Sequence, residues 1–418
     1  MSRYIVVIIS LLLFWGCSTK EPVQIGKKSF ENEDLLIMQA LHLQHQKQYQ
    51  DAIDTYKQLF QKSKKLNYLI EAAKLSFVAT NSPQTLQLLE LGLKQDSNNV
   101  DLRRLLVGYY MKVSRFQEAT QEVEKLLKIE KNARNLAIAG NIYLQQNNYP
   151  LALKYFQSSY NKAKDENTLL NMADILYNFL DKQDEAISYL ETHVRLQGCD
   201  EKVCFKLIEV YGKQKDINGI ITTYKKLYEE NQNDVYAKKI IELYMYKKDT
   251  KSAIEFLKKT GYNQEMLVNI YASLGEFQAA FDAAEKLFEE KNDFVYLGYM
   301  GIYEYELNKN NLSETVLASI ASKFDRALQK INNAVFLNYY GYLLIDHERD
   351  IAKGIALVKE ALLQEPNSLF YLDSLAWGLF KQNKCIEAQK ILEPFMKNIQ
   401  EEEVQMHYQK IQECLGKK

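Results

Sequence analysis

Small residues recur along the chain at a nearly constant spacing, and large apolar residues tend to follow them four positions later. The recurring position is occupied by Ala52, Thr85, Ala119, Ala152, Ala186, Ile220, Ala253 and Ala280, at steps of 33, 34, 33, 34, 34, 33 and 27 residues. Gly354 and Ala388, further along, are again 34 residues apart. Because residues four apart share one face of a helix, each repeat predicts an amphipathic helix. A period of this length indicates stacked units, none of which buries its apolar face alone.

One repeat shows that a second helix precedes the first within each period. Gly140 stands three residues before Tyr143, and Ala152 stands four residues before Phe156. This arrangement resembles the tetratricopeptide (TPR) signature, in which helix A carries a small residue and an aromatic, and helix B carries an alanine and an aromatic. Small helix-A residues, where two backbones would approach closely, are Ala40, Ala73, Gly140, Gly341 and Ala376. The large helix-B residues are Tyr56, Leu89, Val123, Phe156, Leu190, Tyr224, Leu257 and Leu392.

The TPR resemblance covers about residues 33 to 400 and implies an all-α fold. It implies a solenoid of about eleven helix-turn-helix units, with a concave groove lined by the A helices. The polar helix predicted over residues 404–415 would cap the last unit, and the acidic run 401–403 suits a helix N-terminus.

Two breaks in the period divide the repeats. The 27-residue step before Ala280 predicts a shortened segment around residues 261–263. The step from Ala280 to Gly354 is 74 residues, which predicts an over-long helix B over residues 312–331. We therefore predict an N-terminal array at 33–260, an irregular joint at 261–333, and a C-terminal pair with its cap at 334–418. A merely degenerate repeat explains the joint equally well.

The start of the chain has the pattern of a targeting signal. Residues 4–15 are uncharged and almost wholly apolar, which is too short to span a bilayer but suits a signal peptide. Gly16-Cys17 resembles a bacterial lipobox, which implies that residues 1–16 are removed and that Cys17 carries the lipid, including palmitate. Residues 17–32 would then be a tether, and Ser18 after the cysteine implies an outer-membrane lipoprotein facing the periplasm. An ordinary signal peptide or an uncleaved anchor is the alternative.

Composition and motifs argue against catalysis. The chain has only 16 Gly and 5 Pro, too few for an all-β fold or a Gly-rich nucleotide-binding fold. A net charge of −1 gives no reason to expect nucleic acid. No zinc-protease, hydrolase or phosphate-loop motif occurs, and His42 with His45 lacks a third metal ligand nearby. We therefore predict no catalytic residue, no metal, no cofactor and no small-molecule substrate.

Four cysteines remain once Cys17 is set aside, an even number that suits an oxidising compartment. Cys199 and Cys204 lie across a predicted helix start, and Cys385 could approach Cys414. Four cysteines permit 3 pairings, and buried free thiols are equally compatible with the sequence.

Partner binding is expected in the A-helix groove. The repeat phase places amides there at Asn141, Asn171, Asn178 and Asn338, and aromatics at Tyr342, Phe370, Trp377 and Phe380. Amides pair with both donors and acceptors of a peptide backbone, and aromatics are typical interface anchors. Helical spacing puts Phe370, Trp377 and Phe380 on one stripe, which we predict to face water as a docking surface. A solvated inner face whose aromatics touch neighbouring helices is the alternative.

The C-terminal repeats add a closer resemblance. Residues 371–377 (YLDSLAW), following Asn338 and Gly341-Tyr342, resemble the last pair of repeats in a family of bacterial TPR lipoproteins. Members include adaptors that hold a carboxyl-terminal processing protease near its cell-wall hydrolase substrates, and other TPR lipoproteins assist outer-membrane protein assembly or secretin piloting. The resemblance implies a non-catalytic, membrane-anchored scaffold that binds protein partners. The alternative is a peptidoglycan- or glycan-binding protein or enzyme, although no catalytic carboxylate pair is visible.

Overall fold

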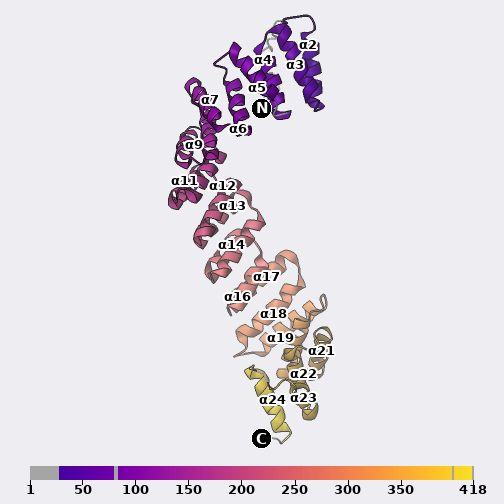
Figure 1. The fold of residues 1–418 in the computed structure, drawn as a ribbon. Coiled ribbons are helices and arrows are strands. Elements are labelled where there is room, and N and C mark those ends of the chain that lie inside the picture. The colour runs from indigo at the N-terminus through magenta and orange to yellow at the C-terminus, as the bar shows by residue number, and fades with distance from the viewer. Residues whose placement is uncertain (1–27, 80–82, 398–399, 417–418) are drawn as a thin grey trace, which may run out of the picture. The chain divides into compact units, whose positions relative to one another are not determined.

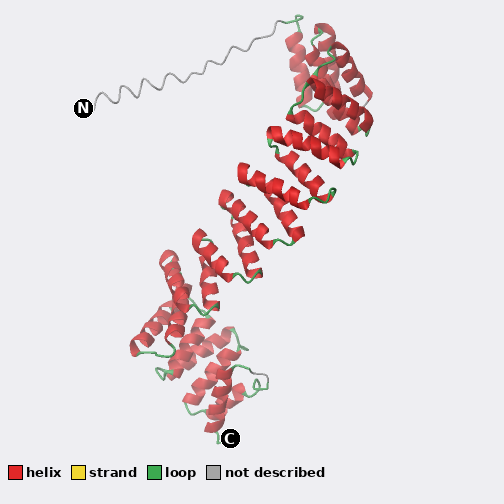
Figure 2. Cartoon of the chain, turned by 90° about the vertical axis from the view of Figure 1, so that its left-hand side faces the viewer, coloured by secondary structure: helices red, strands yellow, loops and turns green. Residues whose placement is uncertain are grey.

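The computed structural model of the protein describes residues 28–79, 83–397 and 400–416. Within these ranges every regular element is an α-helix and no strand occurs (Figures 1 and 2). None of the helices in the described ranges has the length and apolar character needed to cross a membrane. Cys17, the predicted signal peptide and most of the predicted tether lie outside the described residues.

The chain divides into two compact units that meet within one helix, after Thr223. The first unit holds the hairpins α2 (Glu33–His45) with α3 (Tyr49–Ser63), α4 (Leu66–Ala79) with α5 (Pro83–Gln95), α6 (Val100–Lys112) with α7 (Phe116–Ile129), α8 (Ala133–Gln145) with α9 (Tyr149–Ala163), and α10 (Glu166–Asn178) with α11 (Gln183–Gln197). Its last hairpin is α12 (Glu201–Gln214) with α13 (Ile217–Asn231), the helix in which the second unit begins.

The second unit continues the same arrangement. Its hairpins are α14 (Asp234–Tyr246) with α15 (Thr250–Thr260), α16 (Gln264–Ser273) with α17 (Phe277–Lys291), α18 (Phe294–Asn308) with α19 (Glu314–Leu328), α20 (Ala334–Asp346) with α21 (Ile351–Gln364), and α22 (Leu369–Lys381) with α23 (Cys385–Leu392). A last helix, α24 (Glu402–Cys414), follows. The described residues thus form eleven hairpins and a terminal helix, which confirms the predicted all-α TPR fold.

The close helix crossings explain the small residues of the repeat. An added Cβ on Gly341 in α20 would lie 2.8 Å from the carbonyl oxygen of Gly354 in α21. An added Cβ on Gly354 would in turn lie 2.7 Å from the carbonyl oxygen of Gly341. Elsewhere alanine is small enough, and Ala152 and its counterparts Ala52, Ala119, Ala186, Ala253, Ala280 and Ala388 are fully buried. The repeat phase is therefore correct over most of the chain.

The phase is wrong by one residue in α13. Ile220, predicted to be the packed small position, is only half-buried. The preceding Gly219 lies against the ring of Tyr211 instead, where an added Cβ would come within 2.7 Å of it. The expectation of a small residue at this contact was correct, but the repeat pattern placed it one residue too late, at Ile220 instead of Gly219.

The turns between helices A and B repeat a backbone feature that the sequence pattern does not show. A residue with positive φ stands in these turns at Lys47, Ser114, Asn147, Asp181, Lys215, Lys248, Gly275, Glu348 and Asn383. Only one of them is glycine, although glycine adopts this conformation most readily. This explains how so long an array of turns coexists with so few glycines.

The prediction of an over-long helix B at residues 312–331 is wrong. Helix α19 is 15 residues long, the same length as α17. Leu317 takes the place of the small residue in α19, and on the partner helix Gly301 lies against the ring of Phe324, 3.1 Å from an added Cβ. Because a large residue stands where the repeat pattern expects a small one, the pattern did not detect this repeat. Upstream, the A helix α16 is short, with 10 residues, as the 27-residue step predicted. The B helix α15 before it is also short, with 11 residues, which was not predicted.

Both candidate cysteine pairs are disulfides. Cys199 bonds Cys204 with their Cα atoms 5.7 Å apart, and Cys385 bonds Cys414 with their Cα atoms 6.3 Å apart. Both separations lie in the usual range for a disulfide. The second bond ties the end of α24 to the start of α23. Helix α24 also packs against the last hairpin through Val404 and Ile411, so it acts as the predicted cap.

Candidate functional site

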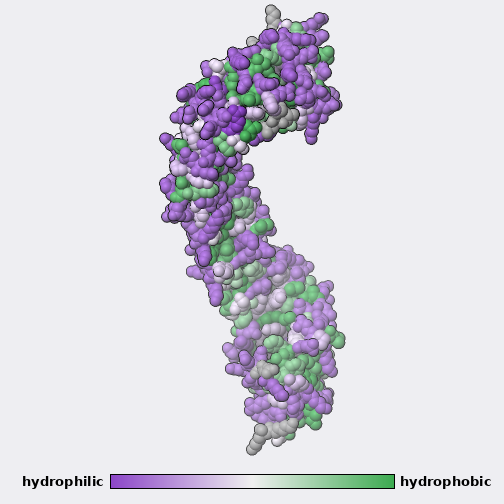
Figure 3. All heavy atoms as spheres, in the orientation of Figure 1, coloured by the Kyte–Doolittle hydropathy of each residue, from purple (hydrophilic) through white to green (hydrophobic). Residues whose placement is uncertain are grey.

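A groove of about 550 Å³ opens in the second unit on its A helices. Its walls come from α18, α20 and α22, and the first turn of α24 contributes Glu403. Glu365 and Ser368 line it from the turn that leads into α22. On the face of the second unit shown in Figure 3, hydrophobic residues gather in patches over the C-terminal helices. We call the groove lined by these helices the A-helix groove, because its walls come mainly from the A helices.

Three of the eight predicted binding residues line this groove together: Asn338, Tyr342 and Phe370. Phe370 is 60% exposed and lines the groove, so its ring is open to a bound ligand. Asn338 is only 9% exposed, and its Oδ1 has no hydrogen-bond partner among the described residues. Buried acceptors are nearly always paired, so this atom marks a place where a partner group is missing.

The prediction that Trp377 faces water is wrong. Its side chain is 3% exposed, and its ring stacks on His407 of α24 with the centroids 4.1 Å apart. The indole Nε1–H donates to Asp346 Oδ1 at 2.9 Å. Phe380 also stacks on the Trp377 ring, with the centroids 4.9 Å apart, and is half-buried. The aromatic stripe exists, but α24 covers its second half and leaves Phe370 open.

The three predicted amides of the first unit are not brought to this groove. Asn141 lies on α8, and Asn171 and Asn178 lie on α10. Asn141 and Asn171 are half-buried, whereas Asn178 is exposed and donates to Asp174 at 3.3 Å. A binding role for these residues stays a prediction.

Sequence reasoning missed the charged lining of the groove. Four carboxylates line it, those of Glu306, Glu365, Asp373 and Glu403, against the single ammonium of Lys309. Lys309 pairs with Glu306 at 3.0 Å, and Asp373 accepts from His407 Nδ1 at 2.9 Å. Glu365 and Glu403 have no ion pair with any described cation. The acidic run before α24 was the available signal, but a helix N-terminus explains such a run without a groove.

Tyrosines line the same groove as neutral donors. Burial raises the pKa of Tyr305 to about 12, and the charges of Asp346, Glu403 and Glu306 add to the effect. Burial raises the pKa of Tyr342 as well, as does the hydrogen bond that its hydroxyl donates to Glu403 at 2.5 Å. The phenols therefore stay protonated and neutral at physiological pH and add no phenolate anion to the groove.

The chemistry of the groove suits binding rather than bond cleavage. The hydroxyl of Ser374, a possible nucleophile by type, donates to the carbonyl oxygen of Phe370 at 2.9 Å and not to a base. Catalytic serines instead need a neighbouring base to take their proton. The groove offers acceptors, neutral donors and an apolar anchor, which is what a recognition surface needs.

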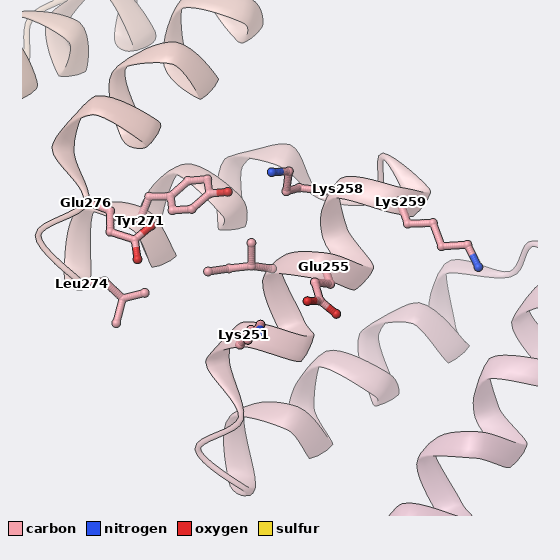
Figure 4. A pocket seen from close by; sticks show the side chains of 8 residues that line it. Lys251, Glu255, Lys258, Lys259, Tyr271, Leu274 and Glu276 are labelled. Atoms are coloured by element: carbon pink, nitrogen blue, oxygen red, sulfur yellow. The ribbon is translucent and has the colours of Figure 1, made fainter.

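A second hollow of about 730 Å³ lies beside α15 and α16 (Figure 4). Lysines 251, 258 and 259 line it with Glu255, Tyr271 and Leu274, and Figure 4 shows Lys259 pointing away from Tyr271. None of the buried, unpaired side-chain atoms found in the described residues belongs to its lining. We assign no site to it.

No protein-family model matches the chain, and no curated protein matches it. Among solved structures, PilF of Pseudomonas aeruginosa is 17% identical with a TM-score of 0.39, over 50% of this chain and 96% of that one. A tetratricopeptide repeat protein from Parabacteroides merdae is 16% identical with a TM-score of 0.39, over 57% of this chain and 97% of that one. TTC0263, a TPR protein of Thermus thermophilus, is 10% identical with a TM-score of 0.33, over 43% of this chain and 98% of that one. Similarity at this level carries no argument about what the chain binds.

Proposed function

We propose that the protein is a non-catalytic scaffold that holds a peptide segment of a protein partner in the A-helix groove of its second unit. The observations that support this most are Phe370, which is 60% exposed, and Asn338, whose buried Oδ1 has no hydrogen-bond partner among the described residues. Both residues line the same groove, so it offers a bound segment an apolar contact together with polar groups.

We further propose that the scaffold is a lipoprotein of the cell envelope, anchored through Cys17 and facing the periplasm. The Gly16-Cys17 junction and the apolar segment before it support the anchor. The two disulfides favour an oxidising compartment. A scaffold anchored in this way would hold its partner near the envelope, for example a protease, a cell-wall hydrolase or an assembly factor.

Photo-crosslinking tests the groove directly. A benzophenone amino acid replaces Phe370 in the full chain, and the control carries it at Leu363, which is 83% exposed on α21 outside the groove. We expect one discrete protein adduct at position 370 and none at 363. Adducts that form equally at both positions contradict a specific groove.

The captured protein is then purified and its affinity measured. Phe370→Ala should weaken binding by roughly 30-fold, corresponding to about 2 kcal/mol for an aromatic anchor, without changing the unfolding midpoint. Undiminished binding to this variant would remove the groove from the proposal. Adducts that disappear on cell-wall digestion would favour a glycan partner instead.

A further inference from the structure

We propose that the A-helix groove recognises a basic side chain, lysine or arginine, within the bound segment, and that Asn338 Oδ1 accepts a hydrogen bond from it. This inference rests on the proposed function and names the chemistry of the same site. The partner is therefore a protein with an exposed, extended segment in which a basic residue lies beside an apolar one.

The first argument is the unpaired acceptor. Asn338 lies on α20 in the wall of the groove, is 9% exposed, and leaves Oδ1 without a hydrogen bond among the described residues. Two of the hydroxyls that line the groove are already engaged, that of Tyr342 with Glu403 and that of Ser374 with a carbonyl oxygen. Oδ1 itself is closed off from solvent, so the Asn338 side chain has to turn towards the groove to accept from a bound group. An ammonium or guanidinium group carries several N–H donors for it.

The second argument is the charge of the walls. Glu365 lies at the C-terminal end of α21, and Glu403 lies in the first turn of α24. Neither carboxylate is paired with a described cation, whereas Lys309, the single lining lysine, is already held by Glu306 at 3.0 Å. The tyrosines are neutral and leave this negative charge in place. A cation entering a half-enclosed site gains more from such charges than it would in open water.

The third argument is the apolar wall. The ring of Phe370 and the side chain of Val335, 60% and 40% exposed, line the same groove. The methylene stem of a lysine or arginine packs along such surfaces while its charged end reaches a polar site. An acidic segment would meet like charge, so the groove also selects against it.

The ligand probe is a displayed library of random linear peptides, selected on the full chain. We expect the bound peptides to be enriched in lysine or arginine next to an apolar residue. The best peptide is then synthesised with its basic residue, and again with norleucine, a neutral residue that keeps the methylene stem. Affinity should fall about tenfold or more on this change, and the affinity of the basic peptide should fall with added salt.

Three variants of the protein separate recognition from folding. Asn338→Leu should lose most of the preference for the basic peptide while its urea unfolding midpoint stays or rises, because the variant removes an unpaired buried polar atom. Glu365→Lys should lower the affinity for the basic peptide about tenfold or more. Its matched control is Glu360→Lys, an exposed residue of α21 that does not line the groove, which should bind like the wild type.

The outcomes distinguish the inference from the function beneath it. If the norleucine peptide binds as tightly as the basic one, or if Glu365→Lys behaves like Glu360→Lys, the inference is wrong. If such peptides still depend on Phe370, the groove remains a binding site without a charge preference. If no selected peptide depends on Phe370, or if soluble peptidoglycan fragments occupy the groove and displace the peptides, both proposals fail.

Discussion

At the residue scale, Trp377 holds the terminal helix in place rather than offering a surface to a partner. Its ring stacks with both Phe380 and His407, and the ammonium groups of Lys381 and Lys410 each lie 5.2 Å from its centroid. His407 in turn is bound to the buried carboxylate of Asp373. The helical period placed Trp377 on the correct stripe. It could not show that α24 covers the half of the stripe that holds Trp377 and Phe380.

Replacement of Trp377 therefore measures core packing. Trp377→Ala should lower the free energy of unfolding by about 3–5 kcal/mol, because it removes a buried indole and leaves a cavity. Urea unfolding followed by circular dichroism checks this. Phe370→Ala, on the same stripe but 60% exposed, is the control and should change stability by less than about 0.5 kcal/mol. Equal effects of the two substitutions would contradict the covered stripe.

Glu33 gives a pH-dependent prediction near the start of the described chain. Burial opposes its ionisation, but hydrogen bonds from Lys65 Nζ at 2.7 Å, Tyr68 at 2.6 Å and the Ser29 amide at 2.6 Å outweigh burial. They lower the pKa of Glu33 to about 2. A lowered folded-state pKa contributes stability that is complete above the unfolded value near 4.5 and is lost as pH falls towards 2.

The test compares wild type with Glu33→Gln by urea unfolding across pH. The wild type should be more stable at neutral pH, and the difference should shrink as pH falls from 4.5 towards 2. A difference that stays constant over this range would mean that the ionised carboxylate contributes nothing.

At the scale of elements, the repeat period predicted which helices form but not the side chains at every crossing. Alanine or glycine stands at most crossings, and there the repeat pattern predicted the helices correctly. In α19, Leu317 stands at that position, so the unit was misread as one long helix; the glycine of this hairpin, Gly301 on α18, lies against Phe324. In this hairpin the small residue against the partner ring lies on helix A, whereas the period was followed mainly on helix B.

The crossing of α20 and α21 is the most sensitive of these contacts. Gly341→Ala should cost about 1–3 kcal/mol, because its Cβ would come within 2.8 Å of a backbone oxygen and the helices would have to move apart. The matched control is Gly212→Ala in α12, where an added Cβ meets nothing within 4 Å. Loss of helix-breaking glycine there should leave stability unchanged or raise it by up to about 1 kcal/mol. Thermal and urea unfolding of both variants test this. A Gly341→Ala variant as stable as the wild type would refute the close crossing.

The disulfide Cys385–Cys414 fastens the cap helix that carries Glu403 into the groove. The bond closes a loop with a sequence separation of 29 residues, and its removal should cost about 3–4 kcal/mol by loop entropy. The Cys199–Cys204 bond closes a separation of only 5 residues and should be worth about 2 kcal/mol. Unfolding of the paired Cys→Ser variants checks the order. A larger loss for the shorter loop would contradict it.

At the scale of the whole molecule, the sequence predicted the hairpin array from the repeat period and the cap from the polar helix that follows the last repeat. Of the groove, it predicted Asn338, Tyr342 and Phe370, which lie on A helices in the expected phase. It missed Glu365, which follows the end of a B helix, and Glu403, which belongs to the cap. Those carboxylates reach the groove only through the tertiary fold, so no periodic pattern marks them.

The proposed membrane anchor belongs to this scale too. Metabolic labelling with a clickable fatty acid should mark the wild-type chain in membranes and leave Cys17→Ala unlabelled. The unlabelled variant should also leave the membrane fraction, because a bacterial lipoprotein depends on its acyl chains for anchoring. Labelling that persists in Cys17→Ala would exclude this cysteine as the attachment site.

The most direct measurement of the central claim is hydrogen–deuterium exchange of the full chain with and without a selected peptide. We predict slower exchange in α18, α20 and α22 and around residues 401–404, with little change in α8 and α10. The Phe370→Ala variant should show no such protection at the same peptide concentration. Protection that appears instead over α8 and α10, or that survives in Phe370→Ala, would contradict the groove of the second unit as the place where a partner binds.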